Sequence, residues 1–300
     1  MFEPSRLGAG AEIVALVRAM QYNTVIYHKV HFSAQNARDR EPKMSEYRFI
    51  QYGVQDDVIT ITIARPPQNV LDIATMEEMS DALDRVAADG SAKVLVVTAA
   101  GERAFSAGVD VVDHTPDKVD RMIEVFHGML TRLLSIPIPT VAAVNGAALG
   151  GGCELAIACD MIVAAEHAKL AQPEIKLGVF PPIAAILLPK ILPMPKAMEL
   201  LLGGGAVDAQ EAARLGLVNR VFAKDGFDRE TRAFLGQFLS LSRVALVHTK
   251  RAIRQASGRS YAEALPVVEQ LYLQELMATE DAKEGLNSFI EKRKPVWKNR

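Results

Sequence analysis

Apolar strands alternate with helical segments from residue 44 onward, and this alternation is the feature that most restricts the fold. The segment 94–97 is entirely apolar, which is typical of a strand buried on both faces of a parallel sheet. Further strands are expected at 58–63 and 141–144. Between them, apolar residues recur at helical spacing, as they do across 118–134. Strands that alternate with helices predict an α/β fold.

The ends of the helices carry local signals. We expect Thr75 to cap the first helix, because its side chain can accept a hydrogen bond from the first turn. After about residue 185 helical patterns dominate. In the last helix we expect Thr279 as the cap, the basic residues 292–294 in the final turn and Pro295 as the stop.

Composition excludes several classes of protein. With 49% hydrophobic and 23% charged residues, the chain is not a disordered polyelectrolyte. Its 34 basic and 36 acidic residues require no basic face, so we expect no nucleic-acid partner. Apolar runs stay shorter than the roughly 18 residues of a membrane span, so a soluble cytoplasmic protein is expected. Cys153 and Cys159 are expected to be buried core residues.

The segment 1–43 differs from the rest, because it ends in a polar run before strand-like sequence begins. We interpret it as a loosely attached extension, or as an over-extended start with Met44 as the natural beginning.

Three consecutive glycines, at positions 150–152, lie between an expected strand and a helix. Glycines there let backbone N–H groups approach a ligand, and a helix N-terminus favours negative charge. A tightly packed helix entry explains the same residues equally well. Small residues around Ala107, after the strand 94–97, again suit a backbone donor.

Two carboxylates stand in hydrophobic stretches. Glu154 follows the glycines on an apolar helix, and Glu174 lies between apolar residues further along. Burial would raise the pKa of each carboxyl toward neutrality, which suits general acid and base chemistry. The helix N-terminus would lower the pKa of Glu154, and a solvent-facing Glu154 is the plain alternative. His and Cys spacing predicts no metal site.

Five motifs in order resemble the crotonase (enoyl-CoA hydratase/isomerase) superfamily, over about residues 46–300. They read AFSAGVD (104–110), NGAALGGGCELAIACD (145–160), QPEIKLG (172–178), DAQEAARLGLVNRV (208–221) and EGLNSFIEKRKPVW (284–297).

The resemblance implies a spiral core of repeated ββα units over 44–240 and a helical trimerisation region over 241–300. It also implies homotrimers or dimers of trimers, an acyl-CoA thioester as substrate and no separate cofactor. By motif, the backbone N–H groups of Ala107 and Gly151 would form an oxyanion hole. The contacts to CoA that the resemblance implies are Gln68, Val70, Ala104, Val109, Val111, Phe289 and Lys292, the last two from the final helix of this subunit or a neighbour.

Glu154 and Glu174 match the two glutamates that flank a water in the hydratases of this family. Having both favours hydration, with Glu154 activating water and Glu174 exchanging a proton at carbon. Prolines and branched residues at 179–185 replace an expected glycine-rich stretch, so we expect a stiffer and more apolar acyl pocket.

This variant is similar to the hydratases of cyclic dienoyl-CoA thioesters in anaerobic aromatic degradation, which implies cyclohexa-1,5-diene-1-carbonyl-CoA as the substrate. A short-chain enoyl-CoA hydratase or isomerase is an alternative, and a non-catalytic or RNA-binding protein of the same fold is another.

Overall fold

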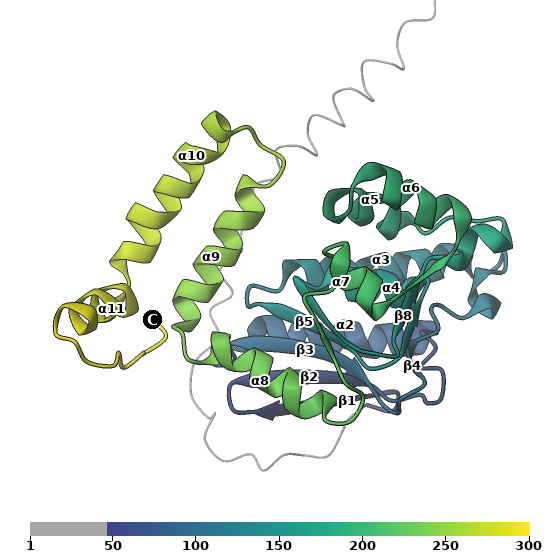
Figure 1. Ribbon diagram of the computed structural model, residues 1–300, viewed down its shortest axis with the longest axis horizontal. Coiled ribbons are helices and arrows are strands. Elements are labelled where there is room, and N and C mark those ends of the chain that lie inside the picture. The colour runs from purple at the N-terminus through teal and green to yellow at the C-terminus, as the bar shows by residue number, and fades with distance from the viewer. Residues whose placement is uncertain (1–46) are drawn as a thin grey trace, which may run out of the picture. The chain divides into compact units, whose positions relative to one another are not determined.

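The computed structural model describes residues 47–300, in which the strands form a six-stranded and a four-stranded sheet (Figure 1). The predicted extension over 1–43 lies outside the described residues. The larger sheet has the order β1 (Ile50–Gln55), β2 (Val58–Ile63), β3 (Val94–Ala99), β5 (Thr140–Val144), β7 (Met161–Ala165) and β10 (Arg220–Phe222). The smaller sheet has the order β4 (Ala104–Ser106), β6 (Ala147–Leu149), β8 (Lys169–Ala171) and β9 (Ala206–Asp208).

Successive repeats supply one strand to each sheet. β3, β5 and β7 pair in parallel in the larger sheet, and the strands that follow them, β4, β6 and β8, pair in parallel in the smaller one. A helix follows each pair of strands. This is the spiral of ββα repeats that the sequence predicts. β1 and β2 form an antiparallel hairpin whose turn residues, Asp56 and Asp57, both adopt positive φ.

Helices flank the sheets and continue to the C-terminus. They are α2 (Ile73–Ala88), α3 (Val119–Ser135), α4 (Gly151–Ala158), α5 (Pro182–Ile191), α6 (Met194–Gly203), α7 (Ala209–Arg214), α8 (Phe227–Leu239), α9 (Arg243–Ala256), α10 (Tyr261–Gln270) and α11 (Glu280–Ile290). Short 3₁₀ segments, η1 (Val111–His114), η2 (Pro173–Leu177) and η4 (Leu276–Ala278), and a π-helical turn, η3 (Leu271–Glu275), lie between them.

The first helix begins earlier than predicted. Asp72, rather than Thr75, is the N-cap of α2, and its Oδ1 accepts a hydrogen bond from Thr75 N at 2.9 Å. Thr75 lies fully buried inside the first turn, where its hydroxyl donates to the same carboxylate. The expectation of a Thr75 cap was therefore wrong.

Alternation along the central strands builds two hydrophobic layers. In β3, Leu95 and Val97 face the layer beneath α2, α3 and α4, whereas Val94 and Val96 face the layer beneath α8. Phe227 of α8 packs in that second layer. Because both faces of the sheet are covered, its inner strands carry apolar residues on both faces.

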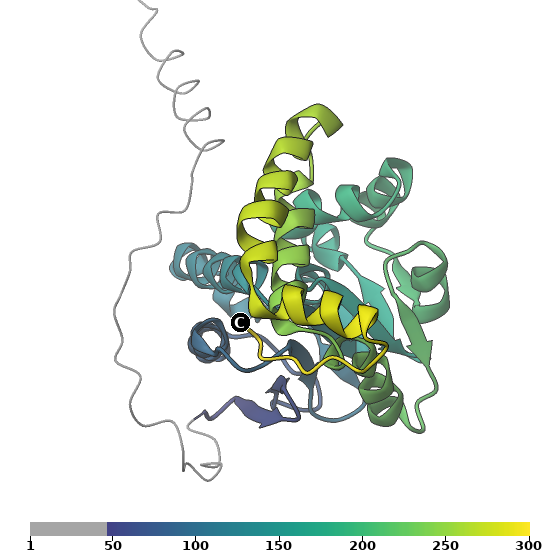
Figure 2. The same cartoon turned by 90° about the vertical axis from the view of Figure 1, so that its left-hand side faces the viewer.

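The C-terminal helices form a separate layer of the chain. α9 and α10 lie side by side (Figures 1 and 2), and α11 packs against α9 and η4. Buried Lys250 of α9 ties this layer to the core through the Ile138 carbonyl, at 2.8 Å, and the Asp160 carboxylate. Thr279 caps α11 as predicted.

The end of α11 differs from the prediction. The helix stops at Ile290, and Lys292 adopts a positive φ of 54° beyond it. Arg293 turns back to pair with Glu284, at 2.5 Å. The basic residues 292–294 therefore follow the helix instead of forming its last turn, and Lys292 does not continue the helix face of Phe289.

None of the helices in residues 47–300 combines the length and apolar character needed to cross a bilayer.

Candidate active site

The three glycines at the start of α4 lie where side chains cannot fit. Gly150 has φ +53°, and a Cβ there would lie 2.5 Å from Glu174 Oε1. A Cβ on Gly152 would lie 2.5 Å from the Ser106 carbonyl oxygen. Close packing at the start of the helix therefore explains part of the need for glycine at these positions. It also brings β4, α4 and Glu174 together at one place.

Two backbone N–H groups at this place point away from the sheet hydrogen bonds. Gly151 is the first residue of α4, so its N–H has no partner within the helix. Val109 lies opposite Leu71 in a parallel bridge, in which Leu71 N donates to Gly108 O and Asp110 N donates to Leu71 O. In such a bridge the N–H of Val109 itself faces the other side. A Cβ built on Gly151 lies 3.3 Å from Val109 N, so the two segments adjoin.

Ala107 does not offer the donor that the sequence predicts. Its N–H donates to the Gln68 carbonyl at 2.9 Å, which commits it to the fold. Val109 stands two residues later, where the parallel bridge leaves the amide facing Gly151. The pairing of two distant segments, at residues 71 and 109, decides which of the two amides is free to bind a ligand.

Glu154 is buried, with 3% of its surface exposed, so it does not face solvent. Its Oε1 accepts hydrogen bonds from the N–H groups of Ile183 and Ala184, at 2.9 and 2.8 Å. Burial, helped by the nearby Glu174 carboxylate, raises the pKa of Glu154 to about 7 against the lowering effect of the two amides. Glu154 can therefore exchange a proton near neutral pH.

Glu174 is partly buried in η2, beside Gly150. Burial raises the pKa of the Glu174 carboxyl above its ordinary value, while a backbone hydrogen bond and the neighbouring His114 oppose the rise. Glu154 lies on α4, Glu174 lies beside Gly150 at the start of the same helix, and Gly151 adjoins Val109 N. The arrangement can hold a carbonyl oxygen and move protons beside it.

The amides that hold Glu154 were missed by sequence reasoning. Pro181 and Pro182 occupy the N-cap and the first position of α5, and the free donors of that helix follow directly after them. Proline at the first position is a known signal for a helix start, and it could have revealed these donors.

The residues expected to contact CoA divide into two groups. Gln68 and Val70 lie in the loop after β2, and Ala104, Val109 and Val111 lie on the β4–η1 segment beside it. Phe289 and Lys292 lie elsewhere, at the end of α11. The side chain of Phe289 is 85% exposed. Within one subunit the structure does not bring these two residues to the others.

A cavity of about 720 Å³ lies apart from this site, between α9, η4, α11 and the core. Its walls are mainly apolar, with Asp160, Lys250 and Arg254 on one side. Among the described residues, no group of three or more His, Cys, Asp or Glu side chains could hold a metal ion. Cys153 and Cys159 are buried and unpaired, as the sequence predicts.

Comparisons with known proteins identify the family of the chain. A sequence model described as enoyl-CoA hydratase/isomerase matches residues 53–300. The chain is 38% identical to cyclohexa-1,5-dienecarbonyl-CoA hydratase of Thauera aromatica, over 81% of this chain and 93% of that protein. It is 37% identical to carnitinyl-CoA dehydratase of Citrobacter koseri, over 81% of this chain and 95% of that protein.

A crystal structure of enoyl-CoA hydratase from Bacillus anthracis superposes with a TM-score of 0.81 at 30% identity, covering 84% of this chain and 100% of that one. These relatives are named as hydratases and dehydratases, which is consistent with the predicted hydro-lyase class. The chain belongs to the enoyl-CoA hydratase/isomerase family.

Proposed function

We propose that this enzyme adds water to the double bond of an unsaturated acyl-CoA thioester, with a cyclic dienoyl-CoA, cyclohexa-1,5-diene-1-carbonyl-CoA, as its substrate. Three observations support the proposal: the Glu174 carboxylate lies beside Gly150, Gly151 adjoins Val109 N, and the Glu174 charge acts on the pKa of Glu154.

The two amides serve the thioester carbonyl. When water adds to the β-carbon, negative charge collects on the carbonyl oxygen as an enolate. N–H groups fixed by the backbone stabilise that charge without having to reorganise, and removing one such donor typically costs about 3 kcal/mol of transition-state stabilisation. We assign this role to Val109 and Gly151.

The two acids move the protons. Glu154, with a pKa of about 7, takes a proton from water while the water oxygen bonds to the β-carbon. Glu174 gives a proton to the α-carbon as the enolate collapses, so one water is added in all. Titration of the pair is shared, because each charge raises the cost of ionising the other. The ascending limb of the pH profile of kcat should lie near pH 7.

The acyl pocket supports a compact substrate. Val179 and Phe180 are large, exposed apolar residues directly before Pro181 and Pro182, which fix the backbone at the start of α5. We expect these residues to form a rigid apolar wall beside the acyl group, which would fit a ring better than a flexible chain with many conformers. The relative from Thauera aromatica is named for such a cyclic thioester, and it supports the same choice.

We further propose that the chain works as a homotrimer or a dimer of trimers in the cytoplasm. Phe289 and Lys292 are distant along the fold from Gln68 and Val70, so their expected contact with CoA requires α11 of a neighbouring subunit. Lys292 would then supply a point charge for a phosphate of CoA.

A panel of acyl-CoA thioesters tests the reaction. The wild-type enzyme is incubated with cyclohexadiene-carbonyl-CoA, crotonyl-CoA and other enoyl-CoA thioesters. The masses of the products are then measured by mass spectrometry. A gain of one water, fastest with the cyclic diene, is expected. Faster turnover of crotonyl-CoA would discard the cyclic assignment, and a product of unchanged mass with a moved double bond would indicate an isomerase.

Two matched variants test the acids. Glu154→Gln and Glu174→Gln keep the size of each side chain but remove its proton exchange, so each should lower kcat by orders of magnitude in a folded protein. Size-exclusion chromatography of the same samples checks the assembly. Unchanged turnover in either variant contradicts the role given to that residue.

A further inference from the structure

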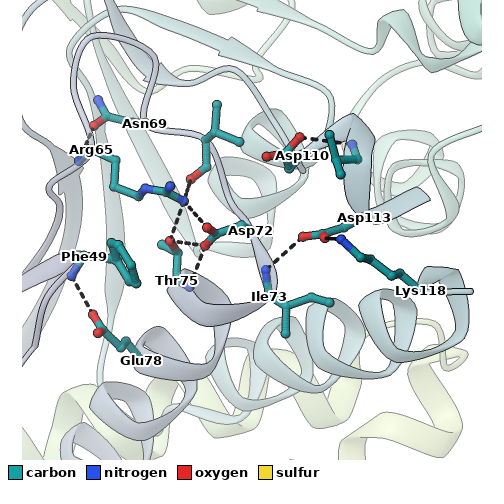
Figure 3. Close-up of polar contacts among 12 residues, drawn as sticks. Phe49, Arg65, Asn69, Asp72, Ile73, Thr75, Glu78, Asp110, Asp113 and Lys118 are labelled. Carbon is teal, nitrogen blue, oxygen red and sulfur yellow. Dashed lines mark hydrogen bonds and ion pairs between the residues drawn. The ribbon is translucent and has the colours of Figure 1, made fainter. Parts of the chain in front are cut away.

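Asn69 is a fully buried amide outside the reacting centre, and its side chain joins three segments of the chain. Its exposed fraction is 0%. Its Oδ1 accepts a hydrogen bond from Arg65 N at 3.0 Å, as Figure 3 shows. Its Nδ2 donates to the carbonyls of Ala100, at 2.9 Å, and Ala104, at 2.7 Å. All three of these bonds are within the normal range of length.

The backbone at Asn69 is also unusual. It adopts φ +50°, a region that asparagine tolerates better than most residues. This conformation turns the loop between β2 and α2 so that Asn69 N reaches back to Arg65 O at 2.8 Å. The side chain and backbone of one residue therefore set the shape of the loop over 65–71.

That loop in turn holds the segment that carries the amide of Val109. Ala107 N donates to Gln68 O at 2.9 Å, and Leu71 N donates to Gly108 O at 2.9 Å. Asp110 N closes the bridge on Leu71 O at 3.1 Å. The direction of the Val109 N–H thus depends on where residues 68 and 71 lie, and Asn69 stands between them.

We propose that Asn69 is a positioning residue for the oxyanion donor: its amide clamps the 65–71 loop to the start of the 104–110 segment, and this fixes the direction of the Val109 N–H. The proposal rests on the proposed function, because it assigns that amide to the thioester oxygen. Asn69 itself touches no substrate.

Asn145 offers a matched control, because its side chain also donates hydrogen bonds to the turn that follows β3. Its Nδ2 donates to the carbonyls of Ala99, at 2.7 Å, and Gly101. Removing it deletes two hydrogen bonds to the turn that follows β3, as removing the Asn69 amide does. Of these two asparagines, only Asn69 binds Ala104 and belongs to the loop that pairs with residues 107–110.

The test compares Asn69→Gly and Asn69→Asp with Asn145→Ala. Glycine keeps the positive φ and removes the clamp, whereas aspartate keeps the shape and the acceptor for Arg65 N but loses both donated bonds. Either variant suffices if the other fails to fold. We expect kcat to fall about 100-fold in both, with a much smaller change in KM, since a misplaced group of this kind costs that much. Asn145→Ala should lower the melting temperature and leave kcat nearly unchanged.

A spectroscopic readout separates positioning from stability. The absorption of bound cinnamoyl-CoA moves to longer wavelength when its carbonyl oxygen accepts hydrogen bonds. This shift should appear in wild type and Asn145→Ala and be reduced in the Asn69 variants. An unchanged shift and kcat in folded Asn69 variants, or an equal loss in Asn145→Ala, overturns the proposal.

Measurements on the wild-type enzyme separate a failure of the proposed reaction from a failure of the role given to Asn69. A wild type that shifts cinnamoyl-CoA but hydrates no thioester refutes the proposed reaction, and the shift in the variants still decides the role of Asn69. A wild type that shows neither property refutes both.

Discussion

Replacing Glu154 by Gln should make the protein less sensitive to pH. The carboxyl has an ordinary pKa of 4.5, which burial raises to about 7 in the folded chain. Below pH 4.5 the carboxyl is protonated in both the folded and the unfolded state, so the free energy of unfolding does not change with pH there. Between the two values the unfolded chain releases the proton and the folded chain keeps it, so the free energy of unfolding falls as the pH rises.

The size of the effect follows from the two pKa values of Glu154. A rise from 4.5 to about 7 corresponds to about 3 kcal/mol of stability that is present at low pH and lost above neutrality. Glutamine has no such titration, and its amide oxygen can still accept hydrogen bonds from Ile183 and Ala184. Relative to Glu154→Gln, the wild type should therefore lose about 3 kcal/mol between pH 4.5 and pH 8.

Urea unfolding of both proteins across this pH range measures the difference. Protein concentration is kept fixed, because association of subunits shifts apparent stability. Titrations of groups that do not interact with Glu154 cancel in the comparison. If the difference in unfolding free energy between wild type and Glu154→Gln stays constant from pH 4.5 to pH 8, the burial argument for Glu154 is wrong.

Three further changes test other parts of the structure. Gly150→Ala should lower kcat more than tenfold, because the new methyl group displaces the Glu174 carboxylate, as steady-state kinetics would show. It should also lower the free energy of unfolding by about 1–3 kcal/mol in urea, because alanine is strained at the positive φ of this position. Asp72→Ala should cost about 1–2 kcal/mol in urea unfolding, through loss of the α2 cap, and an unchanged midpoint would contradict this. Phe105→Ala, at a fully buried position, should cost about 3–5 kcal/mol, against a smaller loss for Phe105→Leu.

Patterns within one segment were sufficient to predict the central strands of the larger sheet, several helices and the two carboxylates in apolar surroundings, but they did not predict the strands of the smaller sheet. The sheet strands show their burial directly, since both faces are apolar, and Glu154 and Glu174 stand out as charges in apolar surroundings. Capping was harder, because Asp72 and Thr75 are both good caps three residues apart. Only the structure shows the Thr75 hydroxyl donating to the Asp72 carboxylate, at 2.6 Å.

Features that depend on distant pairing could not be read from local patterns. The choice between Ala107 and Val109 as a donor is made by the bridge to Leu71, across the whole of α2 and β3. The end of α11 likewise depends on Arg293 folding back onto Glu284. A run of basic residues looks the same whether it ends a helix or leaves it.

The proposed assignment of the carbonyl donors to Val109 and Gly151 has a consequence for mutagenesis. Peptide N–H groups belong to the chain itself, so only a change to proline deletes one, and the alanine variant of Val109 would keep its N–H. The side chains that line the acyl pocket can therefore change while the proposed hydrogen bonds to the carbonyl oxygen are kept. Variation in substrate and constancy of chemistry can thus coexist in one scaffold.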